Sequence, residues 1–428
     1  MGKVIRSTRS VCPVCLKNLP AALCREDDGR IFLEKTCPDH GAFRALVWQG
    51  KTDFDSWLLS EPPMAAGEGL ACPEHCGLCA AHASGSCCVL LEVTRRCNLR
   101  CRFCFADGGA AEDDPSAEEL EAAIAVIVEK CGPVLLQLSG GEPTLRGDLP
   151  RLVRFAKKAG CSAVQLNTNG LRLAEDPDYA ARLAEAGLDI VFLQFDGTDD
   201  EIYRTLRGAP LLREKTEAIR VCDALRLGVT LVPTVVPGVN DRALGGIVRF
   251  ACEHVPAVRG VHFQPVSYFG RHDAAPEGRY TLDRLMADLA EQADIPTDAF
   301  LPSRCDHPLC GFHASFLLGE NGGLQPLRRF RHAPRARGGA QDNRAYVVNH
   351  WRRGPDEPAP ECADGMDFDT FLYRLRQRSL ALSAMAFQDA MNLNIERLRQ
   401  CTLHVYRGGA IVPFCANYLT PMKEDARC

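Results

Sequence analysis

The chain has 428 residues, a net charge of −5 and a pI near 6.2. This charge provides no basic field for a phosphate backbone, so we expect no nucleic-acid partner. Hydrophobic residues make up 46% and charged residues 25%, which is typical of a folded globular protein and argues against disorder. Because no apolar run reaches the roughly 18 residues of a spanning helix, we expect no membrane span and a cytoplasmic location.

The sequence contains 22 cysteines, and many of them stand at C-x2-C or C-x3-C spacings. With no secretory signal pattern at the N-terminus, these spacings favour metal ligation over disulfides. We therefore expect several metal centres in a reducing compartment.

Changes in composition and hydrophobic pattern along the sequence predict four regions. Residues 1–60 carry their own cysteine pattern and predict a ribbon-type domain for one metal ion. Residues 61–88 are rich in Pro, Gly, Ala and Cys and predict an irregular Fe-S segment. Residues 89–295 alternate short apolar runs with amphipathic stretches, and residues 296–428 predict a C-terminal domain with another Fe-S site.

The first predicted metal site combines the motifs CPVC and CPDHG near the N-terminus. Two short turns present Cys12, Cys15 and Cys37, and the fourth ligand is either His40 or Cys24. Zinc accepts nitrogen and sulfur ligands in tetrahedral geometry, and a set of four thiolates also suits iron, as in rubredoxin. We expect one structural zinc or iron ion, with His40 as the favoured fourth ligand.

The second predicted site begins with the C-x3-C-x2-C spacing of Cys72, Cys76 and Cys79. A fourth thiolate follows closely, from Cys87 or Cys88, and His82 is a weaker option. This set predicts an auxiliary [4Fe-4S] cluster, for which Cys87 is the favoured fourth ligand.

The same spacing recurs at Cys97, Cys101 and Cys104, directly after the apolar run 89–94. Three thiolates leave one iron of a [4Fe-4S] cluster without a protein ligand, and such an open iron can bind a substrate or cofactor. The position just after a predicted strand therefore favours a catalytic role for this second triplet.

Six apolar runs predict strands, and amphipathic stretches between them predict helices. Ser116 and Glu119 form a capping-box pattern at the start of the first helix. The predicted strands are 89–94, 134–139, 163–168, 190–195, 230–236 and 261–266, and the predicted helices are 116–130, 148–159, 178–186, 215–227 and 242–252. This alternation indicates parallel βα units in an α/β fold, and six units predict a partial (β/α)6 TIM-like barrel with its chemistry at the C-terminal strand ends.

The C-terminal region has weaker patterns. We expect hairpins around Gly319–Gly323 and over 401–415, and helices over 368–386 and 389–401. Four separated thiolates predict another auxiliary site, which brings the expected number of auxiliary clusters to one or two. These thiolates are Cys305, Cys310, Cys401 and Cys415.

The motif CNLRCRFC at 97–104 resembles the cluster motif of the radical SAM superfamily, including Phe103 before the last cysteine. The resemblance implies a [4Fe-4S] cluster on Cys97, Cys101 and Cys104 that binds S-adenosylmethionine at its open iron. It also implies an electron donor such as flavodoxin or ferredoxin. One electron then cleaves the cofactor to a 5′-deoxyadenosyl radical, which abstracts a hydrogen atom.

Later strand ends extend the resemblance. SGGEP at 139–143 is similar to the glycine-rich segment of the family, where backbone and Glu142 hold the cofactor's amino group, and a carboxylate suits an ammonium group. Arg204 and Arg207 are both possible partners of the cofactor's carboxylate, and Arg207 is the favoured one. The residues that the resemblance assigns to cofactor binding are Phe103, Gly140, Gly141, Glu142, Pro143, Asn167, Gln194, Asp196 and Arg207.

The full-length layout is similar to a multi-cluster radical SAM branch that includes a tetraether lipid synthase and a methylase of a pterin precursor. This implies hydrogen abstraction from an unactivated carbon, leading to carbon-carbon bond formation or methylation of a lipid or small molecule. Two alternatives are a peptide- or protein-modifying maturase and a non-catalytic Fe-S electron carrier or scaffold.

Overall fold

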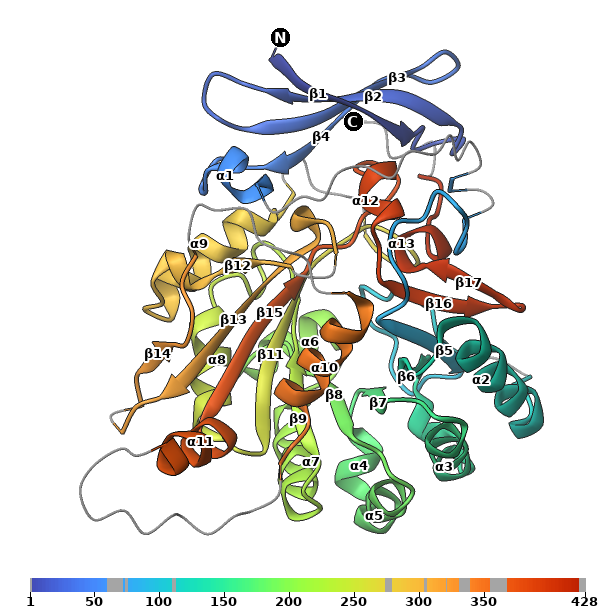
Figure 1. Cartoon of the computed structure of the whole chain (residues 1–428), viewed down its shortest axis with the longest axis vertical. Coiled ribbons are helices and arrows are strands. Elements are labelled where there is room, and N and C mark those ends of the chain that lie inside the picture. The colour runs from blue at the N-terminus through green and yellow to red at the C-terminus, as the bar shows by residue number, and fades with distance from the viewer. Residues whose placement is uncertain are drawn as a thin grey trace.

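A computed structural model gives the structure of the chain. It describes residues 2–59, 72–73, 76–109, 113–273, 279–303, 306–320, 322–330, 339–354 and 368–422. A small sheet lies above a larger body of strands and helices (Figure 1). In the part that the structure describes, no helix is long and apolar enough to cross a bilayer.

The small sheet is a four-stranded antiparallel ribbon in the order β1-β2-β3-β4. Its strands are β1 (Lys3–Val11), β2 (Asn18–Arg25), β3 (Ile31–Cys37) and β4 (Gly41–Trp48), followed by the short helix α1 (Phe54–Leu58). Leu33 and Trp48 are fully buried on the ribbon face that packs toward the main core.

The six predicted βα units are confirmed. Their strands are β5 (Cys88–Thr94), β6 (Leu135–Gly140), β7 (Ala163–Thr168), β8 (Ile190–Gln194), β9 (Gly228–Val232) with its short extension β10 (Thr234–Val235), and β11 (Val258–Pro265). Neighbours in the chain are neighbours in the sheet, and every pair from β5 to β11 is parallel. Each strand is buried on both faces, which explains its continuous apolar sequence.

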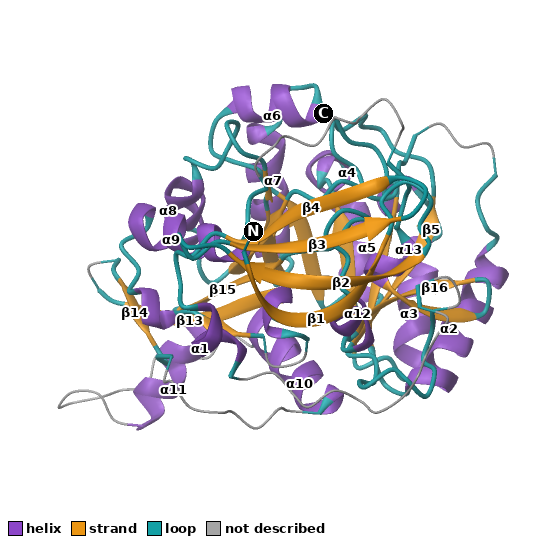
Figure 2. Cartoon of the chain, turned by 90° about the horizontal axis from the view of Figure 1, so that it is seen from above, coloured by secondary structure: helices purple, strands orange, loops and turns teal. Residues whose placement is uncertain are grey.

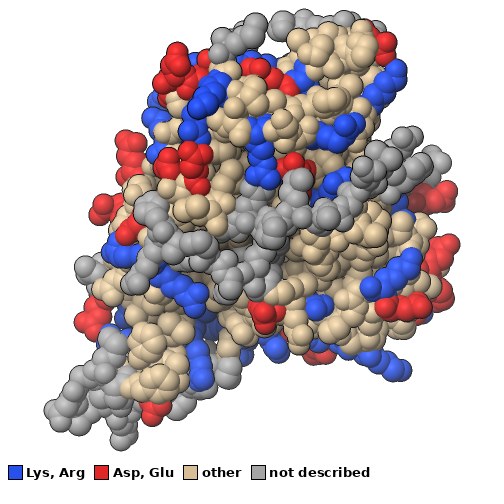
Figure 3. All heavy atoms as spheres, turned by 45° about the horizontal axis from the view of Figure 1, so that its top comes forward, with Lys and Arg blue, Asp and Glu red and all other residues tan. Residues whose placement is uncertain are grey.

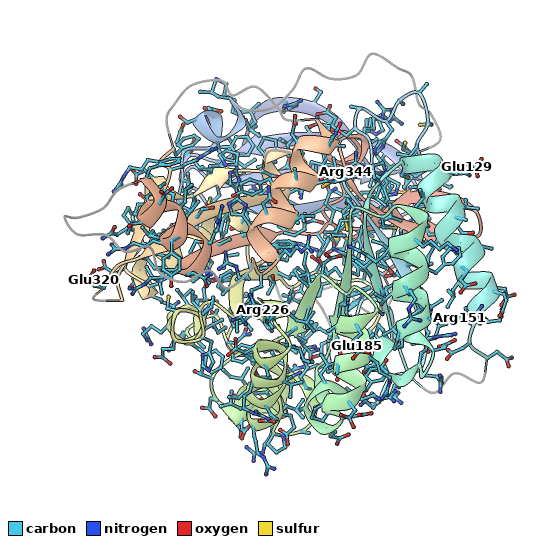
Figure 4. The ribbon with its side chains drawn as sticks, turned by 60° about the horizontal axis from the view of Figure 1, so that its bottom comes forward. Glu129, Arg151, Glu185, Arg226, Glu320 and Arg344 are labelled. Atoms are coloured by element: carbon cyan, nitrogen blue, oxygen red, sulfur yellow. The ribbon has the colours of Figure 1, made fainter. Side chains whose placement is uncertain are left out.

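Helices cover the outside of these strands. They are α2 (Ala117–Cys131), α3 (Leu149–Ala159), α4 (Leu171–Glu175), α5 (Pro177–Glu185), α6 (Asp200–Arg207), α7 (Leu212–Ala224), α8 (Leu244–Glu253) and α9 (Leu282–Gln292), with the 3-10 turns η1 (Pro143–Leu145) and η2 (Thr297–Ala299). Ser116 and Glu119 form the predicted capping box of α2. Glu129 on α2, Arg151 on α3 and Glu185 on α5 lie on this outer layer (Figure 4).

The C-terminal part adds strands to both edges of the same sheet. β15 (Ser379–Met385) pairs with β11 and β16 (Leu403–Arg407) pairs with β5, both in the parallel sense. Beyond them lie the antiparallel strands β12 (Leu301–Pro302), β13 (Gly311–Leu318), β14 (Leu324–Pro326) and β17 (Ala410–Pro413). Among the described residues no pairing joins the two ends of this strand order, so the barrel is open.

Two of the helices predicted in the C-terminal region differ from the structure. The predicted helix 368–386 is wrong in its second half: α11 (Phe368–Gln377) ends and β15 follows, because Leu380, Leu382 and Ala384 are buried between two neighbouring strands. The predicted helix 389–401 contains only α12 (Ile395–Arg399). Both predicted hairpins are present, as β13-β14 and β16-β17.

Helix α10 (Ala340–Trp351) packs against the N-terminal ends of the barrel strands. Val347, Val348 and Trp351 contact a cluster formed by the first residues of four strands, namely Cys88, Leu135, Ala163 and Ile190. Arg344 on α10 donates to Pro133 O at 2.8 Å, and Arg226 donates to Gly354 O at 3.3 Å just beyond the helix (Figure 4). These contacts hold α10 across the lower end of the barrel.

The ribbon packs on the opposite end, where the strands finish. Seen from above, β1 to β4 lie across the barrel (Figure 2). Lys35 is buried and donates from Nζ to Ala390 O at 2.8 Å and Met391 O at 2.9 Å, in the loop after β15. Ser10 donates to Leu393 O of the same loop. Over the described part of one face, acidic and basic side chains are interspersed without an extended area of one sign (Figure 3).

Candidate functional site

A cavity of about 190 Å³ opens at the C-terminal ends of the barrel strands. The loop after β5 contributes Cys97, Cys101 and Cys104 to its wall. Six of the residues predicted to bind a cofactor line the same cavity beside Phe103: Gly140, Gly141, Glu142, Asn167, Gln194 and Arg207. The predicted site residues are thus brought together from several strand ends, and their roles as ligands stay predictions.

The three cysteines differ in exposure. Cys101 is 7% exposed, whereas Cys97 and Cys104 are half-buried. Burial raises the pKa of the Cys97 thiol to about 11, so a bound metal has to offset this cost to hold the thiolate. Gln194 Nε2 lies 3.9 Å from Cys101 Sγ and is in position to donate to it.

The turn after β6 requires its two glycines. A Cβ on Gly140 would lie 2.1 Å from Thr94 O, and one on Gly141 would lie 2.1 Å from Arg96 O. The turn therefore packs directly on the chain that leads to Cys97, and only a residue without a side chain permits this approach. Gly141 N donates to Thr94 O and Glu142 N donates to Arg96 O, and these two hydrogen bonds hold the turn against the chain that leads to Cys97.

Glu142 is 1% exposed and is held by the ends of two strands. Its Oε1 accepts from Thr144 and from Thr168 Oγ1 at 2.7 Å, and its Oε2 accepts from Asn169 N at 2.7 Å. A carboxylate has about four acceptor positions, so Oε2 retains capacity for a further donor. Pro143 is buried in η1 next to it and lies outside the cavity lining.

Asp196 and Arg207 form a buried bidentate ion pair. The two N–O distances are 2.6 and 2.7 Å, and the side chains are 0% and 4% exposed. Burial alone lowers the pKa of Arg207, but the carboxylate of Asp196 outweighs it and raises the pKa. Asp196 lies behind Arg207 rather than on the cavity surface. Arg204, the other candidate, is exposed and pairs with Glu201.

Lys215 on α7 was missed by the sequence analysis. Its side chain is fully buried and donates from Nζ to Asn169 O at 2.5 Å and Gln194 Oε1 at 3.2 Å. Burial lowers the pKa of Lys215 to about 8. The available signal was a lysine on the apolar face of a predicted helix, which is rare unless the amine has a specific partner.

The ribbon brings together the four favoured ligands of the first predicted metal site. The ligand atoms of Cys12, Cys15, Cys37 and His40 all lie within 4.8 Å of one another. His40 Nδ1 is 3.6 Å from Cys12 Sγ and 3.4 Å from Cys37 Sγ, spacings that suit four donors around one tetrahedral ion. Cys24 is not in this group, so the geometry favours His40 over Cys24 as the fourth ligand, and this role stays a prediction.

The other cysteines gather only in part. Cys72 Sγ and Cys76 Sγ are 3.8 Å apart, and both belong to one apolar cluster with Cys415. Cys401 lies near enough to Cys76, Cys310 and Cys415 for their thiolates to repel one another. Two of these sulfurs have donors, since Gln388 N lies 3.3 Å from Cys415 Sγ and Arg397 Nη2 lies 3.5 Å from Cys310 Sγ.

The remaining candidates for the auxiliary sites are placed differently. Cys79 is exposed and Cys87 is buried. Cys88 packs against α10 at the lower end of the barrel. His82 Nε2 donates to Cys401 O at 2.8 Å. Cys305 lies outside the described residues.

Comparison with known proteins decides the family. The profile of the radical SAM superfamily matches residues 91–251, and a profile described as the HMPTM N-terminal zinc ribbon domain matches residues 4–49. The 7,8-dihydro-6-hydroxymethylpterin dimethyltransferase of Methanocaldococcus jannaschii is 32% identical, over 96% of this chain and 92% of that protein. This chain belongs to the radical SAM superfamily.

Membership makes the chain an enzyme of the class that uses a [4Fe-4S] cluster with S-adenosylmethionine, and the ribbon match supports an additional metal site. A GTP 3′,8-cyclase of Heliobacterium modesticaldum is 32% identical over 47% of this chain and 62% of its own length. The solved structure of Streptococcus suis SuiB bound to the precursor peptide SuiA has 16% identity and a TM-score of 0.41, and covers 51% of this chain and 46% of that chain.

The donor set and the cavity fit the cofactor of this class. Three thiols stand at one wall of a cavity that is also lined by glycines, an acidic side chain and amides. Glycines permit close backbone approach, and a carboxylate with a remaining acceptor position suits an ammonium group.

Proposed function

We propose that this enzyme abstracts a hydrogen atom from a carbon of a compact heterocycle related to the pterins and replaces it with a methyl group. A separate one-carbon donor supplies the carbon of this methyl group, and a flavodoxin or ferredoxin supplies the electrons. The supporting observation is the similarity over nearly the full length to a dimethyltransferase that is named for a dihydropterin. The similarity to a GTP 3′,8-cyclase is a weaker guide, because it covers only 47% of this chain.

In this proposal Cys97, Cys101 and Cys104 hold the cluster. When bound, the cluster and S-adenosylmethionine supply the radical that removes the hydrogen atom. Gly140 and Gly141 let the backbone approach the cofactor, Glu142 Oε2 accepts from its amino group, and Gln194 positions Cys101. Arg207 presents donors that Asp196 orients, in a cavity whose apolar walls exclude water.

The other metal centres have supporting roles in this proposal. A single zinc or iron ion on Cys12, Cys15, Cys37 and His40 stiffens the ribbon. One or two auxiliary [4Fe-4S] clusters use the thiols gathered around Cys72, Cys76, Cys401 and Cys415, and a flavodoxin or ferredoxin supplies electrons. Two observations support these clusters: Cys72, Cys76 and Cys415 belong to one apolar cluster, and N–H donors lie near the sulfurs of Cys415 and Cys310.

A deuterium-transfer experiment tests the proposal without depending on the source of the methyl group. The reconstituted enzyme is incubated without oxygen with reductant, S-adenosylmethionine and 7,8-dihydro-6-hydroxymethylpterin deuterated at its saturated carbons. We expect deuterium in the 5′-deoxyadenosine that forms. Formation of 5′-deoxyadenosine that contains no deuterium and is unaffected by the pterin would contradict the proposed substrate.

A further inference from the structure

A second cavity of about 120 Å³ continues the first one into the barrel. The residues that line both cavities are Phe105, Asn167, Phe192, Gln264, Phe387 and Phe414. The second cavity extends from these shared walls to Cys88 and Leu135 at the start of two strands, and to Val347 and Trp351 of α10. We call it the inner chamber.

The inner chamber has room for about one ring. A cavity of about 150 Å³ holds one benzene-sized ring, and the inner chamber of about 120 Å³ is too small for a long acyl chain. A fused bicycle would place one ring in the inner chamber and extend into the adjoining outer cavity. The lower end of the chamber is closed by the described residues of α10, which are held in place by Arg344. The chamber is therefore suited to a compact molecule.

Aromatic walls suit a flat ligand. Phe192 and Trp351 stand with ring centroids 5.1 Å apart at the lower end, and Phe387 and Phe414 stack at 4.3 Å near the upper end. Aromatic rings favour stacked or edge contacts with other rings. A planar heterocycle can thus bury both of its faces here.

Polar side chains interrupt the apolar lining, and three of them can offer a hydrogen bond to a ligand: Gln137, Gln264 and His262. Asn167 approaches Gln137 Oε1 at 3.5 Å, and Gln137 Nε2 has no partner among the described residues. The side-chain amide of Gln264 likewise has none in the described part of the chain. His262 Nδ1 bonds Ser383 Oγ at 2.9 Å, which leaves Nε2 for a ligand.

The described lining of the chamber has no cationic side chain that could compensate the charge of a phosphate group. Among the described lining residues there is no lysine or arginine, and the carboxylate of Asp306 accepts from Thr402. Arg207 in the outer cavity is already neutralised by Asp196. Burial lowers the pKa of His262 to about 4, so its imidazole is neutral at physiological pH. A buried phosphate would have no compensating cation, which carries a large free-energy cost.

We infer that the inner chamber binds an uncharged, unphosphorylated, planar heterocycle whose amide-like edge bonds Gln137, Gln264 and His262, and that it rejects phosphate esters. This rests on the proposed function and specifies its substrate class. A ring edge that combines N–H donors with a carbonyl acceptor matches amide side chains, which offer both groups. A ligand lacking that edge leaves buried polar groups unpaired and is discriminated against.

Ligand binding to the reconstituted full-length enzyme tests the charge preference. Equilibrium binding is measured without oxygen in the presence of S-adenosylmethionine, for 7,8-dihydro-6-hydroxymethylpterin, for its diphosphate ester and for GTP. We expect the unphosphorylated pterin to bind at least about tenfold more tightly than either phosphorylated compound. Tighter binding of the diphosphate ester or of GTP would overturn the inference.

Two variants test the polar edge. Gln137→Met and Gln264→Met keep the length of the side chain and remove the amide, so each should weaken pterin binding by about five- to tenfold. Gln341→Met, on an exposed position of α10, is the matched control and should leave the dissociation constant unchanged. Unchanged binding by both chamber variants, with circular dichroism confirming that they fold, would contradict the assigned contacts.

The two proposals fail in different ways. If the diphosphate ester is preferred and deuterium still reaches 5′-deoxyadenosine, the proposed function stands and the inference about phosphate falls. If no pterin binds and no deuterium is transferred, the proposed function fails and the inference falls with it. The comparison of ligands uses the unmodified enzyme, so it remains decisive even if a variant does not fold.

Discussion

At the scale of residues, the motifs predicted which side chains lie together at the cavity, but not which partners compensate the charges of its buried acidic and basic groups. The sequence could not choose firmly between Arg204 and Arg207, because both lie on one helix and only burial distinguishes them. In the structure Arg207 is buried against Asp196, whereas Arg204 is exposed. Glu142 was predicted from its turn, but its protein donors come from Thr144, two residues on, and from the end of the next strand, which no local pattern reveals.

Lys215 gives a pH-dependent prediction. Burial lowers the pKa of its amine from the ordinary value of 10.5 to about 8. Between these pH values the unfolded chain binds more protons than the folded chain, so stability rises with pH and is lost as pH falls. We expect the free energy of unfolding of the wild type to rise by about 2–3 kcal/mol relative to Lys215→Met across this interval.

Denaturant titrations at a series of pH values measure this difference. Lys158→Met removes an exposed lysine and serves as the control, with the same pH dependence as the wild type. If Lys215→Met also follows the wild type from pH 8 to pH 10.5, burial does not perturb this amine as described.

At the scale of elements, the strands and helices of residues 89–295 were predictable because the hydrophobic period and the local helix-capping residues indicate the same element boundaries. The end of the helical pattern at 368–386 was not, since SLALSAM reads equally well as a helix or as a buried strand. Tertiary pairing with β11 and β13 decided the outcome. The sequence predicted that Cys12, Cys15 and Cys37 lie together in the ribbon, whereas only the fold of the turns shows that His40, and not Cys24, lies beside them.

The ribbon gives a metal-binding prediction. His40→Ala removes one of four candidate ligands, so we expect the affinity for the ion to fall by about 2–4 kcal/mol, roughly a quarter of the binding free energy of a structural zinc site. Cys24→Ala removes a buried thiol outside the group and should retain the ion. Metal content after dialysis against a graded chelator measures both, and equal retention by the two variants would exclude His40 as a ligand.

At the scale of the whole molecule, the barrel strands extend beyond the six predicted units. β16 lies against β5 although Leu403 and Cys88 are more than 300 residues apart in the chain, and β15 covers the opposite edge. No local periodicity specifies pairing at such a separation, so the sequence predicted the six units without their flanking strands. The loop after β15 also anchors the ribbon through Lys35.

These flanking strands predict that residues 89–295 do not fold cooperatively alone. The isolated fragment would expose the backbone edges of β5 and β11, together with the apolar faces that β15, β16 and α10 cover. We expect a broad thermal transition and rapid proteolysis of the fragment, against one sharp transition and resistance for the full chain. A sharp melting transition of the fragment would show that the C-terminal strands are dispensable.

The central claim is that the thiols of Cys97, Cys101 and Cys104 hold the cluster that cleaves S-adenosylmethionine. The most direct measurement is the rate of 5′-deoxyadenosine formation, without oxygen and with dithionite, in the variant that replaces all three by alanine. The control variant replaces Cys131, Cys161 and Cys252, three thiols that were assigned to none of the candidate metal sites. We predict that the first variant forms no 5′-deoxyadenosine and that the control keeps the wild-type rate. Formation at the wild-type rate by the first variant would contradict the account.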